Sequence, residues 1–404
     1  MRKKKLAIIG TVGIPANYGG FETLAEHLVE ELNDKMDISV YCSKKKYTKE
    51  QRVNFHKGAK LIWLPFDANG LQSIIYDSIS IIHAAFTADV LLVLGVAGGF
   101  LFPFVKLFTN KKIIVSIDGI EWKRNKWNKW LRWFLWASEW MAVKFSHADI
   151  ADNESIQDYT AMRYKTLSNI IEYGADHTQH VKPTPEDRIK YVFLNGSYAF
   201  KVCRIEPENN IHTVLEAFSK LPLHKMVIVG NWNVNEYGKN LRTQYSSFEN
   251  ITLLDPIYNQ RELDLLRGNC TIYIHGHSAG GTNPSLVEAM YLGLPVIACN
   301  VNYNKSTTEN AALYFKSADD LMNIIQTHHI PEFISIGYKM MEIARRRYTW
   351  KVIANKYFFL IEKVSVKKSK SQVNPFKNLS IESHPLLNLE LSHLKQAKSF
   401  YEKI

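Results

Sequence analysis

A glycine-rich turn in the second half of the chain contains the residue types best suited to chemistry. It reads GHSAGGTNPSLVEAM at residues 276–290 and follows a short apolar run that ends at His275. Glycines let the backbone approach a ligand, Thr or Asn can cap the helix that follows, and proline suits the first helical position. Because unpaired N–H groups at a helix start attract anions, the turn predicts a diphosphate cradle. Its candidate ligand-binding residues are Gly280, Gly281, Thr282, Asn283, Ser285 and Glu288.

Glu288 has two interpretations. It lies about one turn inside the predicted helix, where its carboxylate can accept hydrogen bonds from the sugar hydroxyls of a bound nucleotide, typically a ribose. Acidic residues near a helix N-terminus are also common because they offset the helix dipole. Residue type and position leave both interpretations open.

A second glycine-rich turn, GTVGIPANYGGFET at residues 10–23, leads from the first apolar run into a helical pattern. Four glycines with a proline favour a ligand loop over a simple tight turn, and Gly13, Gly19 and Gly20 are its candidate binding residues. A nicotinamide cofactor fits poorly. The spacing is not GxGxxG, and no acid ends the second predicted strand.

Charged residues follow two other predicted strands. Arg204 is expected at the end of the first strand of the second half, where a guanidinium can bind phosphate oxygens in bidentate fashion. Asp118, Glu121 and Arg124 follow the strand predicted at residues 113–117. Asp118 and Glu121 either hold a sugar or acceptor hydroxyl, or form a salt-bridged loop with Arg124.

His275 and His277 alternate along a strand end, so both side chains can face one way. A metal site would need a third ligand nearby, and the sequence offers none. We therefore expect at least one of the two histidines to line the ligand pocket, and no bound metal.

Residues 122–140, WKRNKWNKWLRWFLWASEW, contain six of the nine tryptophans and five basic residues. Tryptophan with lysine suits a membrane interface, although a helix packed in the core would explain part of the pattern. The aromatic residues are expected around the whole helix rather than along one stripe, so some of them should be exposed. We predict peripheral membrane contact near an acceptor site, carried by Trp122, Arg124, Trp127, Trp133 and Trp136.

Short apolar runs alternate with amphipathic helical patterns along the chain, which predicts the α/β class with parallel sheets covered by helices. The expected strands are residues 5–9, 38–42, 60–64, 90–94, 113–117, 191–194, 225–229, 251–253, 271–274 and 295–298. The proline-rich, charged segment 181–190 is expected to be a linker.

The alternation predicts two Rossmann-like, doubly wound domains at residues 1–183 and 184–347, facing a central cleft. A helix at residues 348–365 is expected to pack back on the first domain. Residues 366–404 are expected to form a basic tail with a weak helix.

The composition narrows the class of function. A chain of 404 residues with 46% hydrophobic and 22% charged residues suits a folded protein of two domains. The net charge of +11 favours anionic partners, but no nucleic-acid-reading motif accompanies the basic residues. Four scattered cysteines without a CxxC pair favour a reduced, cytoplasmic protein. The apolar run at residues 90–105 is too short and interrupted to span a membrane.

The turn at residues 276–290 resembles the nucleotide-diphosphate-sugar site of retaining GT-B glycosyltransferases of family 4. Their pattern is E-x7-E followed by A-x-x-x-G-x-P-V-I, and the chain has Glu288-Ala289 and then GLPVI at residues 293–297. Gly280 replaces the first acid of the family pattern, which the family uses around the donor sugar. Arg204 has no lysine a few residues after it, although the family usually places one there.

Further motifs resemble bacterial rhamnosyltransferases of capsule and cell-wall polysaccharides, and together they cover roughly residues 5–360. They are GTxGIPxxYGGFET at Gly10, DGxEWKRxKW at Asp118, EYGAD at Glu172, RIEPENNI at Arg204 and the GGTNPS turn itself. Val12 departs from the subgroup, which has arginine there.

The resemblance implies a GT-B fold and transfer of L-rhamnose from dTDP-β-L-rhamnose, with retention and without a metal cofactor. The implied acceptor is a lipid-diphosphate-linked saccharide at the cytoplasmic membrane face. Asp118, Glu121 and Arg204 become the catalytic candidates, while Arg204, both histidines and the residues of both glycine-rich turns become donor-binding. A UDP-hexose donor, or a non-catalytic nucleotide-sugar-binding protein, is the alternative.

Overall fold

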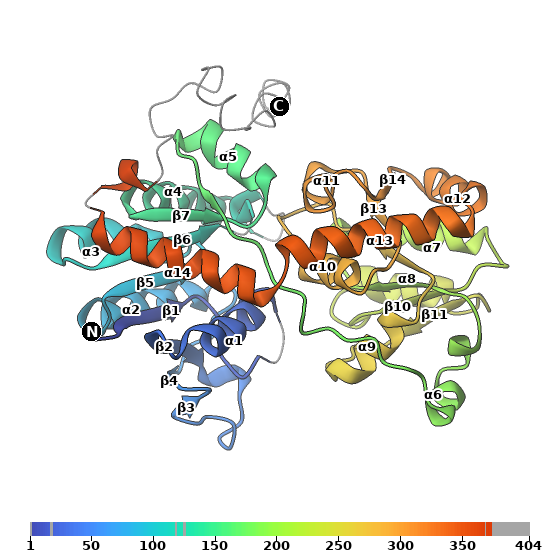
Figure 1. Cartoon of the computed structure of the whole chain (residues 1–404), viewed down its shortest axis with the longest axis horizontal. Coiled ribbons are helices and arrows are strands. Elements are labelled where there is room, and N and C mark those ends of the chain that lie inside the picture. Colours follow the sequence, from blue (N-terminus) through green and yellow to red (C-terminus); the bar gives the residue numbers. More distant parts are fainter. Residues whose placement is uncertain (1, 17–18, 118, 124–126, 368, 374–404) are drawn as a thin grey trace. The chain divides into compact units, whose positions relative to one another are not determined.

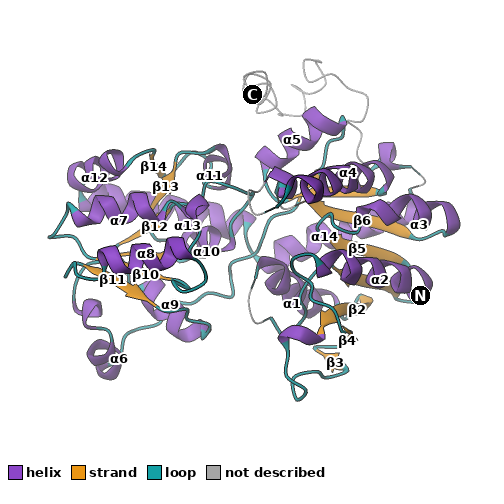
Figure 2. Cartoon of the chain, turned by 180° about the vertical axis from the view of Figure 1, so that it is seen from behind, coloured by secondary structure: helices purple, strands orange, loops and turns teal. Residues whose placement is uncertain are grey.

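The structure is a computed structural model that describes residues 2–16, 19–117, 119–123, 127–367 and 369–373. It divides into two compact units, Met1–Glu172 with Trp350–Ile404 and Tyr173–Thr349. Each unit is a β-sheet covered by helices (Figures 1 and 2). The α/β class with two largely parallel sheets is therefore confirmed.

The sheet of the first unit has the order β3-β4-β2-β1-β5-β6-β7-β8, and its pairs are parallel except for β3 with β4. Its strands are β1 (Lys4–Ile9), β2 (Met36–Ser43), β3 (Phe55–His56), β4 (Ala59–Leu64), β5 (Val90–Leu94), β6 (Lys112–Ile117), β7 (Ala148–Ala151) and β8 (Asn169–Ile170). All five residues of β5 are buried, which explains why this strand is a continuous apolar run. The five strands expected here from the sequence are confirmed.

The α-helices of the first unit are α1 (Gly20–Leu32), α2 (Gln72–Thr87), α3 (Phe102–Phe108), α4 (Lys129–Phe145), α5 (Glu154–Tyr164) and α14 (Trp350–Val366). Its short 3₁₀ turns are η1 (Lys44–Lys46), η2 (Gly99–Leu101), η3 (Glu121–Lys123) and η6 (Lys370–Gln372). The chain passes from β1 to β2 and β4 on one side, then returns to β5, β6 and β7 on the other. Right-handed connections therefore place α2, α3 and α4 on one face of the sheet and α1 on the opposite face.

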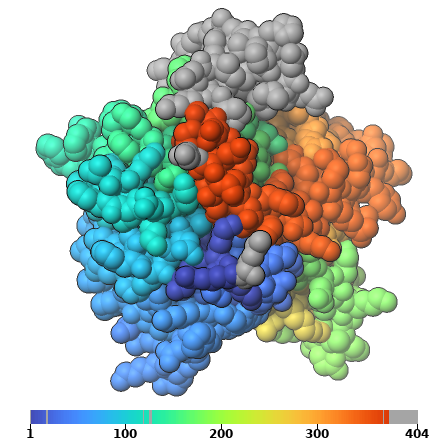
Figure 3. All heavy atoms as spheres, turned by 60° about the vertical axis from the view of Figure 1, so that its left-hand side comes forward, coloured from blue at the N-terminus to red at the C-terminus, as the bar shows by residue number. Residues whose placement is uncertain are grey.

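Helix α14 packs against α1, although the two are far apart in the sequence. The rings of His27 and Trp350 stack with centroids 4.3 Å apart, and Lys4 pairs with Glu362. In Figure 3, α14 (red) lies against the dark-blue residues of the N-terminus. The expected weak helix of the tail falls on residues 374–404, which lie outside the described residues.

The sheet of the second unit has the order β11-β10-β9-β12-β13-β14, and its pairs are parallel. Its strands are β9 (Ala199–Val202), β10 (Met226–Val229), β11 (Ile251–Leu254), β12 (Ile272–His275), β13 (Val296–Cys299) and β14 (Leu313–Phe315). Its helices are α6 (Pro185–Lys190), α7 (Ile211–Ser219), α8 (Glu236–Tyr245), α9 (Gln260–Gly268), α10 (Pro284–Tyr291), α11 (Asn302–Thr307), α12 (Ala318–Thr327) and α13 (Ile330–Arg347), with 3₁₀ turns η4 (Val192–Asn195) and η5 (Pro207–Asn209).

The strand expected at residues 191–194 is wrong. These residues form η4, and the first strand of the unit is β9. Phe193 and Leu194 are buried in a core cluster with Phe200 and Tyr273. A short apolar run marks burial but does not separate a strand from a helical turn, which is why the pattern misled.

The first unit ends at Glu172 rather than at the expected residue 183. Residues after Glu172 bond to the second unit, because the Ala175 N–H donates to the Tyr348 carbonyl and the Gln179 N–H donates to Asp264. The expected linker contains α6, which Thr184 begins with a capping box. Within the described parts of the chain, no helix is long and apolar enough to cross a bilayer.

Candidate functional site

The strand order of the second unit reverses between β9 and β12. The chain moves from β9 to β10 and β11 on one side, and then to β12, β13 and β14 on the other. Ligands of doubly wound sheets bind beyond the carboxyl ends of the strands at such a reversal. Two segments leave the sheet there, the loop 203–210 after β9 and the turn 276–283 after β12.

The turn after β12 is fixed by a capped helix. The Asn283 side-chain oxygen accepts hydrogen bonds from the Ser285 N–H (3.0 Å) and the Ser285 hydroxyl (2.8 Å), and Pro284 opens α10. The predicted cap and proline position are confirmed. The Asn283 carbonyl also accepts from the N–H groups of Leu286 and Val287. The N–H groups of Ser285, Leu286 and Val287 therefore already have acceptors inside the turn.

The glycines of the turn remain as anion donors. Gly280 has a φ of 106°, in the left-handed region that favours glycine. The N–H groups of Gly280 and Gly281 make no hydrogen bond to another residue of the described chain. These two amides are therefore the backbone groups that the turn can offer to a diphosphate.

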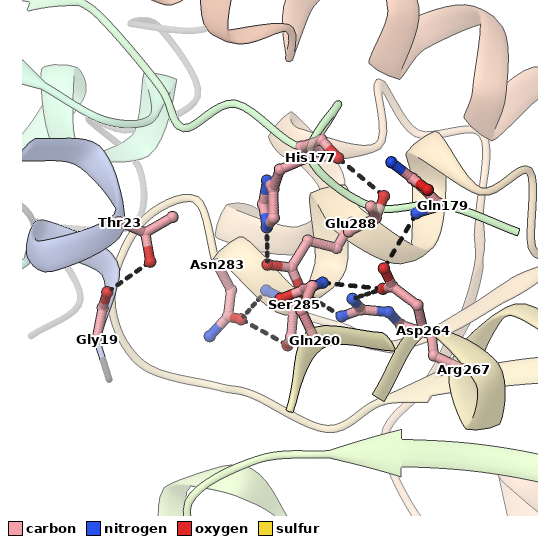
Figure 4. Close-up of polar contacts among 12 residues, drawn as sticks. Gly19, Thr23, His177, Gln179, Gln260, Asp264, Arg267, Asn283, Ser285 and Glu288 are labelled. Carbon is pink, nitrogen blue, oxygen red and sulfur yellow. Dashed lines mark hydrogen bonds and ion pairs between the residues drawn. The ribbon is translucent and has the colours of Figure 1, made fainter. Parts of the chain in front are cut away.

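Glu288 is held by a guanidinium and an imidazole of its own unit. One carboxylate oxygen lies 3.2 Å from His177 Nε2, and the other pairs with Arg267 (Figure 4). Burial would raise the pKa of Glu288, but Arg267 and His177 outweigh it and lower the pKa to about 2. The residue is therefore an ion-paired carboxylate.

Arg267, on α9, is the centre of this cluster. It is completely buried and also pairs with Asp264 at 3.0 Å. Asp264 accepts further bonds from the Gln179 N–H and the Gln260 amide, as Figure 4 shows. A buried guanidinium between two carboxylates fixes the Glu288 side chain, because moving either partner would leave a charge unpaired.

The sequence interpretation missed Arg267 and His177. His177 directly follows the EYGAD motif, which is a usable signal. Arg267 lies 21 positions before Glu288, and nothing in the spacing relates the two.

The two histidines of β12 and its turn differ in environment. His275 is buried, its Nε2 has no partner among the described residues, and burial with Lys201 nearby holds its pKa well below the usual range. His277 Nδ1 lies 2.6 Å from the Asn209 side-chain oxygen. The ring centroids of the two histidines are 6.0 Å apart. Among the described residues, no three His, Cys, Asp or Glu side chains gather as metal ligands.

Arg204 lies two residues after β9 and is exposed. Its carbonyl accepts from the Asn209 amide at 2.7 Å, which fixes the loop backbone while leaving the guanidinium without an ion pair in the described structure. The same loop is tied to the turn after β12. Asn210 donates to the Gly276 carbonyl at 2.8 Å, and the Ser278 N–H donates to the Glu208 carbonyl at 2.9 Å.

The glycine-rich turn of the first unit is closed by its own helix. Glu22, in the first turn of α1, accepts from the Val12 N–H (2.6 Å) and the Thr11 hydroxyl (3.0 Å). Gly13 has a φ of 136°, and a Cβ there would lie 2.9 Å from the Cys42 Cβ. A Cβ on Gly19 would lie 2.0 Å from the Glu22 carboxylate. Packing therefore explains Gly13 and Gly19, and Gly20 is the first residue of α1.

The acidic candidates of the first unit are only partly described. Asp118 and Arg124 lie outside the described residues. Glu121 accepts a hydrogen bond from the Trp127 indole at 3.0 Å. The Trp122 indole donates to the Tyr159 hydroxyl at 3.0 Å, so this part of the tryptophan segment is anchored on α5.

The tryptophans of α4 share one side, so the expectation that they surround the helix is wrong. Trp130, Trp133, Trp136 and Trp140 follow one another every three or four residues and are 83%, 64%, 44% and 42% exposed. The buried residues of α4, such as Leu135 and Glu139, face the opposite way. With Trp122, Lys129 and Arg132, two of these tryptophans line an open pocket.

Two family models match the chain, one in each half. Residues 3–176 match a family model described as a domain of unknown function, DUF1972. Residues 184–326 match the model for glycosyl transferases group 1. No curated protein has a sequence close enough to this chain to count as a match.

Solved structures share the architecture over most of the chain. Sucrose-phosphate synthase from Thermosynechococcus elongatus has a TM-score of 0.74 at 16% identity, over 90% of this chain and 99% of that one. HepE from Anabaena, solved with UDP and glucose, has a TM-score of 0.67 at 15% identity, over 89% and 99%. The α,α-trehalose 6-phosphate synthase from Burkholderia multivorans has a TM-score of 0.68 at 10% identity, over 90% and 97%.

The fold of the two units is the GT-B fold of glycosyltransferases. More particularly, residues 184–326 form a group 1 glycosyltransferase domain.

Proposed function

We propose that the chain transfers L-rhamnose from dTDP-β-L-rhamnose, with retention, to a lipid-diphosphate-linked saccharide during synthesis of a bacterial surface polysaccharide. It acts at the cytoplasmic face of the membrane, to which it binds peripherally. One observation supports a nucleoside-diphosphate donor. The exposed guanidinium of Arg204 and the unbonded amides of Gly280 and Gly281 follow adjacent strands at the reversal of the sheet, on loops joined by hydrogen bonds.

These groups suit a nucleoside-diphosphate leaving group. The bond from the anomeric carbon to the diphosphate oxygen breaks while the acceptor oxygen bonds to the same face of that carbon. The acceptor proton passes to the leaving diphosphate, so no enzymatic nucleophile is needed. Arg204 and the glycine amides stabilise the charge that develops on the diphosphate, in the manner of an oxyanion hole. No metal takes part in this scheme.

Glu288 orients the donor in this scheme. Its carboxylate is fixed by Arg267 and His177 and keeps lone pairs that can accept from ribose hydroxyls. His277 and Thr282 complete the donor side. Glu121, with Asp118, is assigned to the acceptor hydroxyl on the first unit.

A UDP-hexose is the second candidate donor. The resemblance to HepE, whose structure contains UDP and glucose, favours it. The dTDP-rhamnose donor rests on the motif resemblance alone.

The test is release of nucleoside diphosphate by the purified chain, given a lipid-diphosphate saccharide and, in turn, dTDP-rhamnose, UDP-glucose, UDP-GlcNAc and GDP-mannose. We expect release with dTDP-rhamnose only. Release with UDP-glucose only would keep the glycosyltransferase and replace the donor. Saturable binding without release from any donor would favour the non-catalytic binding protein.

The acceptor half of the proposal depends on the tryptophan segment. Exposed tryptophans beside Lys129 and Arg132 suit a bilayer interface, where indoles lie among headgroups and cations meet anionic lipid. Trp133→Ala and Trp136→Ala should weaken binding to vesicles, whereas Trp232→Phe, inside the second unit's core, should not. Unchanged vesicle binding with lost stability would assign these tryptophans to the core.

A further inference from the structure

Helix α2 is apolar on two opposite sides. Its buried side carries Tyr76, Ile81, Ala84 and Ala85, with the polar residues Asp77 and Ser80 among them. Its outer side carries Ile75, Ile79, Ile82 and Phe86, which are 48%, 36%, 50% and 80% exposed. These four positions recur every three or four residues, so they form one continuous stripe away from the sheet. A soluble surface helix normally carries polar residues on that side.

Helix α3 continues the same surface. Leu107 and Phe108 are each 75% exposed, and Phe104 is 58% exposed. Such large apolar side chains are normal when scattered singly, but a contiguous patch marks an interaction site.

The three helices lie next to one another on one face of the sheet. The segment that begins α3 lies between its two neighbours. A Cβ on Gly98 would lie 2.4 Å from Ile81 of α2, and a Cβ on Gly99 would lie 2.6 Å from Ala142 of α4. Figure 2 shows α2, α3 and α4 side by side. The tryptophan stripe of α4 is therefore the edge of a broader apolar face.

Within the described residues of α2, α3 and α4, this face exposes positive charge and no acid. The sequences of α2, α3 and α4 contain two acidic residues, Asp77 and Glu139, and both are buried. Lys106, Lys129 and Lys144 are exposed, and the Lys144 ammonium lies 4.6 Å from the ring centroid of Trp140. An apolar surface edged by lysine and tryptophan matches the boundary of an anionic bilayer.

A second copy of the chain fits this surface less well. In a two-fold dimer the same patch meets itself, so the exposed lysines of one copy would approach those of the other, and like charges oppose such a contact. A bilayer with anionic headgroups presents negative charge to these lysines.

We propose that the outer face of α2, α3 and α4 inserts into the interface of a membrane that contains anionic lipid. The proposal deepens the membrane contact assigned above to the tryptophan segment, and rests on it for the role of α4. It adds α2 and α3 as the larger part of the contact. The first unit then lies with this side of its sheet against the lipid.

The test is co-sedimentation of the full chain with vesicles of phosphatidylcholine, with and without phosphatidylglycerol. We expect binding to the anionic vesicles, and a loss of about tenfold in the double variant Ile75→Asp/Ile82→Asp, because two charges would enter the interface. The matched control is Leu223→Asp, at a 94% exposed leucine of the second unit, which should bind as the wild type does. Lys106→Glu should weaken binding to anionic vesicles only.

Three results would overturn the proposal: no vesicle binding by the wild type, equal binding by the double variant, or wild-type dimers in gel filtration that the double variant dissociates. Thermal denaturation shows whether each variant is folded, and Ile75→Gln/Ile82→Gln is a milder replacement if the charges disturb folding. Nucleoside-diphosphate release with a detergent-solubilised acceptor should be unchanged in the double variant. A chain that binds vesicles but releases no diphosphate would refute the proposed function and leave the membrane surface standing.

Discussion

The two units each place a glutamate early in the helix after a glycine-rich turn, and the two glutamates act in opposite ways. Glu22 turns back to the Val12 N–H and the Thr11 hydroxyl, so it occupies two donors at the start of its own turn. Glu288 pairs with Arg267 and His177 and leaves the amides of Gly280 and Gly281 unbonded. The comparison teaches that a glycine-rich turn before a helix is an anion site only when its donors stay free.

The pKa values of the two carboxylates shift in opposite directions because different groups face them. Burial raises the pKa of Glu22, and hydrogen bonds from Val12 and Thr11 only partly offset it. For Glu288, a guanidinium and an imidazole outweigh burial and lower the pKa to about 2. A buried carboxylate thus stays ionised where a cation faces it, and is held towards its protonated form where only neutral donors do.

Arg267→Met should have the largest effect of the substitutions that test this comparison. It leaves the buried carboxylates of Glu288 and Asp264 without a cation, which costs about 3 to 5 kcal/mol in the free energy of unfolding of the second unit. Thermal denaturation measures the loss, and nucleoside-diphosphate release should disappear with it. Arg261→Met, at an exposed arginine of the same helix, is the control and should behave as the wild type. An unchanged midpoint for Arg267→Met would refute the central role of this ion pair.

Arg204→Ala should reduce nucleoside-diphosphate release by about 100-fold, because one donor to the developing phosphate charge is lost. Its side chain is exposed and forms no ion pair with the described residues, so the denaturation midpoint should not move. Arg242→Ala removes another arginine of the unit, one paired with Asp255 on the surface, and is the matched control. Equal rates for the two variants would remove Arg204 from the site.

Glu288→Gln should alter stability in acid. The folded-state pKa of Glu288 is below its unfolded value, so its contribution is complete above pH 4.5 and is lost as the pH falls towards 2. The wild type should therefore lose more stability than the variant between these pH values. Denaturation of both proteins at several pH values measures the difference, and parallel curves would contradict the assignment.

Glu22→Gln should have the smallest effect on stability. Its effect should change with pH in the direction opposite to that of Glu288→Gln. Its folded-state pKa is raised, so the wild type is most stable below the unfolded pKa and loses stability as the pH rises through the folded value. The variant keeps an acceptor for the Val12 N–H, and its stability should not fall as the pH rises. The free energies of unfolding of the two proteins should therefore differ by about 1 kcal/mol or less. The same pH series measures it, and a large loss of activity in Glu22→Gln would show that the first turn also binds a ligand.

Local features of the fold were predictable where short-range chemistry decides them. The cap at Asn283, the proline that opens α10 and the continuous apolar run of β5 depend on neighbours in the sequence. The segment at residues 191–194 was not predictable, because burial of Phe193 and Leu194 is compatible with a strand or a 3₁₀ turn.

The candidate site was predictable only as a set of positions. Its motifs located the turn after β12 and Arg204, yet the bonds that join the two loops link residues 66 and 70 positions apart. Lys201 was also missed. It is a lysine in an otherwise apolar strand, and burial lowers its pKa beside His275 and Gly276.

The sequence by itself determined the alternation of strands and helices, the glycines with positive φ and the segments that carry charge and tryptophan, because these follow from local propensity and hydrophobic pattern. Only the tertiary structure decided which donors remain free, which cation faces Glu288, and that the outer sides of α2 and α3 extend the tryptophan face of α4. Those features depend on side chains brought together from distant parts of the chain, and hydrophobic periodicity carries no information about such partners.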